Sequence, residues 1–125
     1  MHHTVAFTVE RTHWQSAGQA TFHFSLEPNL LYFQGHFPQM PILPAVAQLK
    51  LLMDCVHELE PQLQFVGAPA MKFTHVLRPH DQVRLELKRV GTKLSFTYYV
   101  LHAHHEIMAS SGHITLEQAC GQDGS

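Results

Sequence analysis

Charged residues are scarce in this chain. Only 14% of its 125 residues are Asp, Glu, Lys or Arg, whereas a typical soluble domain has about a quarter. Ten acidic and eight basic residues give a formal net charge of −2, so composition supplies no electrostatic reason to expect nucleic acid as a partner. Hydrophobic residues make up 45%. This excludes an intrinsically disordered chain, because disorder requires high charge and low hydrophobicity.

Cysteines and long apolar runs are also few. The two cysteines, Cys55 and Cys120, do not make a disulfide framework, and Cys55 stands in an apolar run typical of a buried thiol. No stretch approaches about 18 consecutive apolar residues, so we expect no transmembrane helix. The first residues do not combine a basic start with an apolar core, so we expect no signal peptide. These absences favour a cytoplasmic protein with no membrane partner.

Histidine, in contrast, is abundant, with twelve residues. Three of them, His102, His104 and His105, lie close together in the sequence. No cysteine or carboxylate stands at ligand spacing beside them, and a zinc site needs such partners. We therefore expect no metal centre.

Alternating apolar and polar residues predict strands over much of the chain. We expect six of them, over residues 4–11, 20–26, 70–76, 83–87, 94–100 and 108–116. Gly18 marks a turn between the first two strands, which are predicted to form a hairpin.

One helix is expected among these strands, over Ala45 to Leu59. Pro44 can open it and Pro61 ends it. Its residues are apolar almost all round, which is typical of a buried helix. The polar exceptions fall on one narrow stripe and are Lys50, Asp54, His57 and Glu58. A single buried helix in a strand-rich chain indicates an α+β fold in which a curved antiparallel sheet wraps around one long central helix. We expect one domain over residues 1–118 and a polar tail over 119–125.

The segment from Glu27 to Pro44 has four prolines and many apolar residues, so it is predicted to be a packed loop with a functional role. It holds His36 shortly before the helix begins. The first backbone amides of that helix, at Ala45 and Val46, can polarise a carbonyl group. An imidazole fixed near a polarised thioester or ester can remove a proton next to that carbonyl.

The run GHFPxxPxLPxVxQ over this loop and helix resembles the signature of the hot-dog-fold 3-hydroxyacyl-acyl-carrier-protein dehydratases, the FabZ/FabA-like family. The stretch from Lys72 to Glu86 is similar to the second block of that family, a basic-aromatic strand followed by a Pro-x-Asp turn and a strand. Within the family the chain looks closest to the small dehydratases of aryl polyene gene clusters. The resemblance implies a hot-dog fold and a homodimer with active sites at the subunit interface.

The resemblance also implies roles for individual residues. His36 would take the α-proton, with Gly35 and Phe37 beside it in the substrate site. The amides of Ala45 and Val46 would hold the thioester oxygen, and Gln48 matches a family glutamine. The residues implied to be catalytic or to bind substrate are therefore Gly35, His36, Phe37, Ala45, Val46, Gln48 and Lys50.

Position 50 departs from the family pattern, because the family has an acid where this chain has Lys50. A lysine whose pKa is lowered by burial can protonate the departing hydroxyl. Alternatively, Lys50 only orients that hydroxyl and water donates the proton. Asp54, one turn further along the helix, either pairs with Lys50 or reaches the site as the acid itself.

The implied reaction is the loss of water from a 3-hydroxyacyl thioester carried on acyl carrier protein, which gives a trans-2-enoyl thioester in fatty acid or aryl polyene type biosynthesis. No metal or redox cofactor is expected, because the thioester itself acidifies the α-proton and the phosphopantetheine arm arrives with the substrate. Lys72, Arg78 and Arg84 could meet an acidic carrier protein. Two rivals stay open: a hot-dog acyl thioesterase, and a non-catalytic acyl or carrier-protein binding module in which Lys50 has replaced the acid.

Overall fold

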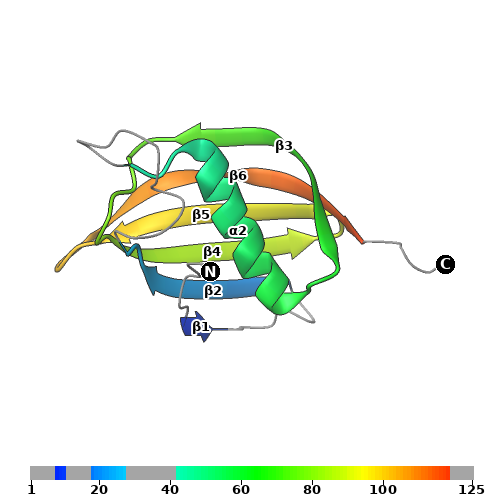
Figure 1. Ribbon diagram of the computed structural model, residues 1–125, viewed down its shortest axis with the longest axis horizontal. Coiled ribbons are helices and arrows are strands. Elements are labelled where there is room, and N and C mark those ends of the chain that lie inside the picture. The colour runs from blue at the N-terminus through cyan, green and yellow to red at the C-terminus, as the bar shows by residue number, and fades with distance from the viewer. Residues whose placement is uncertain (1–7, 11–17, 28–41, 119–125) are drawn as a thin grey trace.

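The computed structural model describes residues 8–10, 18–27 and 42–118. They form one antiparallel six-stranded sheet with the order β1-β2-β4-β5-β6-β3 and one long helix, α2 (Figure 1). The strands are β1 (Thr8–Glu10), β2 (Gln19–Ser25), β3 (Leu63–Phe73), β4 (Gln82–Val90), β5 (Lys93–Leu101) and β6 (Glu106–Gln118), and the helix is α2 (Ala45–Leu59). The sheet curves behind the helix, so the expected α+β arrangement is confirmed.

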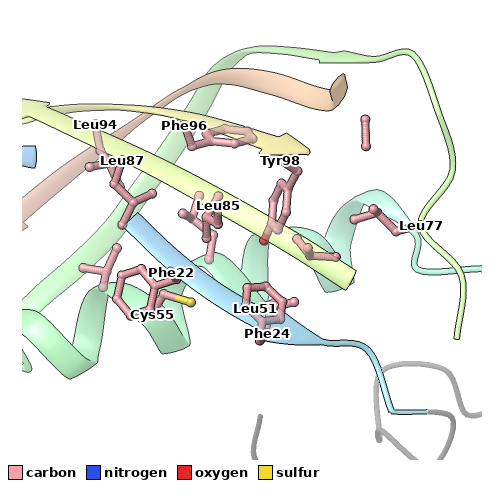
Figure 2. Packing of buried hydrophobic residues seen from close by; sticks show 14 of the residues in the cluster. Phe22, Phe24, Leu51, Cys55, Leu77, Leu85, Leu87, Leu94, Phe96 and Tyr98 are labelled. Carbon is pink, nitrogen blue, oxygen red and sulfur yellow. The ribbon is translucent and has the colours of Figure 1, made fainter. Parts of the chain in front are cut away.

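The predicted alternation sets which side chains of the central strands face the helix. Alternate residues of β2, β4 and β5 are buried, as the pattern indicates. These buried side chains are Ala20, Phe22, Phe24, Val83, Leu85, Leu87, Leu94, Phe96, Tyr98 and Val100. Figure 2 shows side chains of α2 and of these strands filling the space between helix and sheet. A two-residue turn joins β4 to β5, and Gly91 permits it because its φ is 61°.

Helix α2 has the predicted bounds. Pro44 is its N-cap residue, and the helix ends at Leu59, two residues before Pro61. Its burial differs from the prediction, because the buried residues of the helix lie on the side toward the sheet. The buried residues are Ala47, Gln48, Leu51, Leu52, Cys55 and Val56. On the other side Val46 is 57% exposed, and Lys50 and Asp54 are exposed as well. The apolar composition of α2 therefore exceeds what the sheet of a single chain covers.

Strand β3 departs from the prediction at both ends, because it begins at Leu63 instead of residue 70 and ends at Phe73 instead of residue 76. Gly67 and Pro69 are residues that disfavour a regular strand, so the sequence pattern does not predict one here. However, β3 lies at the edge of the sheet and pairs only with β6 among the described strands, so a proline costs no ladder hydrogen bond on its open side. Register shifts near Gly67 accommodate this segment.

Strand β6 departs from simple alternation in one place. Alternation puts Met108 on the same face as the buried Ile114 and Leu116, but Met108 is 45% exposed, whereas its neighbour Ala109 is fully buried. The pairing with β5 shifts between Tyr98 and Tyr99, so that Ala109 is an extra residue in β6. Such a bulge breaks the period of two and turns Met108 outward.

Within the part of the chain that the structure describes, no helix has the length and apolar character needed to cross a membrane.

Candidate active site

A cavity of about 530 Å³ lies at the N-terminus of α2. One wall comes from the chain entering the helix and the other from the end of β3 and the segment after it. The lining residues are Ile42, Leu43, Pro44, Ala45, Gln48, Phe73, Thr74, His75, Val76 and Arg78. The amide of Leu43 donates to the carbonyl of Leu77 at 2.8 Å, and this hydrogen bond ties the two walls together.

The helix presents uncapped amides at this cavity. Pro44 caps α2 without a side-chain hydrogen bond, and the first turn has no acidic residue. The first hydrogen bond within the helix runs from the amide of Gln48 to the carbonyl of Pro44, at 2.9 Å. The amides of Ala45 and Val46 therefore have no partner within the helix, and their partial positive charge is available to an oxygen atom. Ala45 lines the cavity and Val46 is not among the lining residues, so their predicted role in holding the thioester oxygen stays a prediction.

Gln48 is 3% exposed and is held by hydrogen bonds to three other parts of the chain. Its Nε2 donates to the carbonyl of Leu43 at 3.0 Å, and its Oε1 accepts from Oγ of Ser110 at 2.7 Å. The hydroxyl of Tyr98 donates to its backbone carbonyl at 2.7 Å. These bonds fix the start of α2 to β5, to β6 and to the chain that precedes the helix. Much of the hydrogen-bonding capacity of Gln48 is thus used inside the protein.

The second wall includes residues that the sequence prediction did not select. The amides of Thr74 and His75 both donate to the carbonyl of Ala109, at 2.9 and 3.1 Å. Oγ1 of Thr74 donates to the carbonyl of Met108 at 2.8 Å. This segment was predicted as strand through residue 76, so alternation gave no reason to place His75 in a cavity. A signal that could have found it is the pair of polar residues directly after Lys72-Phe73, in the block that resembles the family.

Lys50 and Asp54 do not line this cavity. Both are exposed on the side of α2 that faces away from the sheet. At 3.6 residues per turn, Lys50 stands about 200° around the helix from Gln48. The structure therefore does not bring Lys50 to the cavity of its own chain. The predicted pair between Lys50 and Asp54 stays a prediction.

Gly35, His36 and Phe37 lie outside the described residues, so their predicted roles are untested. The predicted tail over 119–125, with Cys120, lies outside them too.

Two other reactive groups are placed away from the cavity. Burial, and then the charges of Asp54 and Glu58, raise the pKa of the Cys55 thiol, which keeps it protonated. The rings of His102 and His105 stack 5.2 Å apart between β5 and β6. Among the described residues, no three His, Cys, Asp or Glu side chains come close enough together to hold a metal ion.

Comparison with solved structures gives two relatives that match over nearly the whole chain. An uncharacterized protein from Erwinia carotovora subsp. atroseptica is 29% identical with a TM-score of 0.78, covering 93% of this chain and 98% of that one. The dehydratase heterocomplex ApeI:P from Xenorhabdus doucetiae contains a chain that is 28% identical with a TM-score of 0.76, covering 91% and 98%. The fluoroacetyl-CoA thioesterase FlK is 17% identical with a TM-score of 0.52, covering 82% and 87%, and shares the fold alone.

Curated relatives match a shorter region. The 3-hydroxyacyl-(acyl-carrier-protein) dehydratase FabZ of Thermotoga neapolitana is 36% identical over 67 residues, which are 50% of this chain and 49% of that protein. The same enzyme of Desulfotalea psychrophila is 35% identical over 80 residues, or 56% and 53%. The chain thus spans about half the length of the curated relatives it matches.

A family model described as ApeI-like, ApeI dehydratase, matches residues 11–113, which is most of the chain. The fold, the start of α2 and these similarities agree with the resemblance found in the sequence. The chain has the hot-dog fold and belongs to the ApeI-like dehydratase family.

Proposed function

We propose that this protein removes water from a 3-hydroxyacyl thioester carried on acyl carrier protein and releases the trans-2-enoyl thioester. The observation that carries the proposal is the cavity at the uncapped N-terminus of α2, in a chain of a dehydratase family. Amides at a helix start stabilise the oxyanion that forms when a thioester loses its α-proton. The resemblance to the small dehydratases of aryl polyene clusters favours an aryl polyene type substrate over an ordinary fatty acyl chain.

The chemistry needs a base, an oxyanion site and a proton for the leaving group. His36 takes the α-proton. The electron pair of the broken C–H bond then forms the new C=C bond. The amides of Ala45 and Val46 hold the thioester oxygen while negative charge is on it. The C–O bond then breaks toward oxygen, and the hydroxyl leaves as water after it accepts a proton. No metal or redox cofactor takes part in this scheme, since the phosphopantetheine-bound thioester supplies the activation.

We propose that two chains together form each active site. Lys50 faces away from the cavity of its own chain, so it can only serve the cavity of a second chain. A second chain on that side would put Lys50 near the cavity of its neighbour, where an ammonium group orients the leaving hydroxyl or protonates it. Exposed apolar side chains support a covered surface there, with Val46 on α2 and Phe65 and Val66 on β3. We propose a homodimer. A different partner subunit is the alternative, which the heterocomplex of the Xenorhabdus relative favours.

The carrier protein would approach the mouth of the cavity in the cytoplasm. Arg78 lines the cavity and is exposed, and Lys72 is exposed near the end of β3. The family resemblance implies an acidic carrier protein as the partner. Positive charges at the mouth of the cavity would speed its association with the enzyme.

Thioester hydrolysis is the less supported alternative. It needs a carboxylate that activates water, and none lines the described part of the cavity. The one observation that supports a non-catalytic binding module is Lys50, which stands where the family has an acid. Such a module predicts tight binding of acyl carrier protein without turnover, and a gain of activity from nothing in a Lys50→Glu variant.

Mass spectrometry of 3-hydroxyacyl carrier protein tests the proposal directly. We expect the full-length protein to produce a species lighter by about 18 Da, the mass of water, and to release no free carrier thiol. We expect a His36→Ala variant to lose at least about a hundredfold in rate, as general-base removal does. Release of free thiol would establish the thioesterase, and binding without any mass change would establish the binding module. Water loss that persists in the His36→Ala variant would remove His36 as the base.

A further inference from the structure

Four polar side chains line the described part of the cavity, and three of them are accounted for. Gln48 bonds to Leu43 and Ser110, and Oγ1 of Thr74 bonds to the carbonyl of Met108. Arg78 is exposed to solvent. The fourth, His75, is half-buried, and its imidazole makes no hydrogen bond to another described residue. Among the described lining residues, His75 is therefore a half-buried polar side chain that no hydrogen bond to another described residue occupies.

The backbone at His75 is held in one place. The amides of Thr74 and His75 share the carbonyl of Ala109, the buried extra residue of the β6 bulge. Two residues later, Leu77 accepts the amide of Leu43 from the opposite wall. His75 thus stands across the cavity from the start of α2, on a segment fixed at both ends. This rigidity is what a group that acts on a bound substrate requires.

The proposed reaction lacks an assigned proton donor within one chain, because Lys50 lies about 200° around the helix from Gln48. We infer that His75 binds the 3-hydroxyl group of the substrate and supplies the proton with which that hydroxyl leaves as water. In this step the C–O bond breaks, its electron pair stays on oxygen, the oxygen takes the proton from the imidazolium, and His75 is left neutral. Solvent restores the proton. The inference rests on the proposed dehydration and leaves Lys50 an orienting role.

Among the described residues that line the cavity, no carboxylate faces His75. Arg78, on the same segment, is the other basic side chain that lines the cavity. The first turn of α2 has no acid, and the nearby residues of β6, Met108 and Ala109, do not ionise. Among the described residues that line the cavity, His75 is the one imidazole, the side chain that proteins use most often as a general acid or base.

Turnover of 3-hydroxyacyl carrier protein by a His75→Gln variant tests this assignment. Glutamine keeps a hydrogen-bond donor of similar reach but cannot give up a proton. We expect kcat to fall about 100- to 1,000-fold, within the range for loss of a general acid, and the decline of wild-type activity at high pH to disappear. His80→Asn is the matched control, since His80 is exposed on the same segment and does not line the cavity. A His75→Gln variant within threefold of the wild-type kcat, with an unchanged pH profile, overturns the assignment.

A binding measurement separates this inference from the proposed function. The probes are two stable amide analogues of acyl pantetheine, one with a 3-hydroxyl group and one without it. If His75 holds the hydroxyl, wild-type protein prefers the hydroxylated probe by at least about tenfold, and a His75→Leu variant binds both alike. This result can be obtained even if the wild type proves unable to turn over substrate, in which case only the proposed dehydration fails. Equal binding of both probes by the wild type contradicts the role of His75.

Discussion

A single residue, Gln48, is hydrogen-bonded to three other parts of the molecule. Its carboxamide bonds to Leu43 in the chain before α2 and to Ser110 in β6, while its backbone carbonyl accepts from the hydroxyl of Tyr98 in β5. Gln48 and Ser110 are the two buried polar residues among those the structure describes. Buried polar groups are costly unless they are satisfied, so this network fixes one arrangement of the helix start against the sheet.

Ser110 is the part of this network that can be removed with least disturbance. A Ser110→Ala variant leaves Oε1 of Gln48 buried without its donor, and we expect the free energy of unfolding to fall by about 1–3 kcal/mol. Urea unfolding followed by circular dichroism measures it. Ser111→Ala is the control, because Ser111 is the next residue and is only half-buried. Equal losses in the two variants would show that the hydrogen bond to Gln48 does not stabilise the fold.

Among the secondary-structure elements, α2 was the easiest to predict and β3 the hardest. Pro44 and Pro61 delimit α2 in the sequence, and no helix breaker stands between them, so its bounds agree with the structure. The early half of β3 contains Gly67 and Pro69, which local patterns assign to a loop. Its pairing with β6, a partner about 40 residues further along the chain, outweighs that local preference. Local sequence patterns contain no information on such a partner.

The close approach of β3 and β6 depends on Gly112. A Cβ atom at this position would lie 2.2 Å from the carbonyl oxygen of Ala70 and 2.9 Å from Cα of Met71. Backbone atoms cannot yield as a side chain does. We therefore expect a Gly112→Ala variant to lose about 1–3 kcal/mol of stability, the usual cost of overpacking.

Gly67 provides the matched control for that substitution, because it lies in the same pair of strands and a Cβ atom there would meet nothing within 4 Å. Thermal unfolding of the two alanine variants makes the comparison. We expect the Gly67→Ala midpoint to stay near the wild-type value while the Gly112→Ala midpoint drops by several degrees. A Gly112→Ala variant as stable as its control would show that the two strands can separate without cost.

At the level of the whole molecule, the sequence predicted one wall of the cavity and not the other. Ala45, which lines the cavity, was named because a proline-rich loop and a helix start are visible in the sequence, and Gln48 was named because the run GHFPxxPxLPxVxQ resembles the family signature. His75 was missed because its place depends on where an edge strand ends and on a bulge in a different strand. The orientation of Lys50 relative to the cavity could not be predicted from the sequence either. It depends on which side of α2 packs against the sheet.

Among the residues that the structure describes, β3 pairs with β6 alone, so no described strand covers its other edge. An edge strand presents unpaired amides and carbonyls, which favour pairing with another chain. Val66 on this edge is 53% exposed, next to Phe65 at 42%. Exposed apolar side chains at a strand edge favour a contact with another chain there.

A Val66→Lys variant tests whether this edge joins two chains. We expect the wild-type protein to have the mass of two chains in analytical ultracentrifugation, and Val66→Lys to weaken the association at least about tenfold, because a lysine would lose its hydration in the interface. Val90→Lys is the control, since Val90 is 67% exposed at the end of β4 and lies away from this edge. If both variants stay dimeric, the chains meet elsewhere. If the wild type is monomeric, the proposed homodimer is excluded, and a different partner subunit is the alternative to test next.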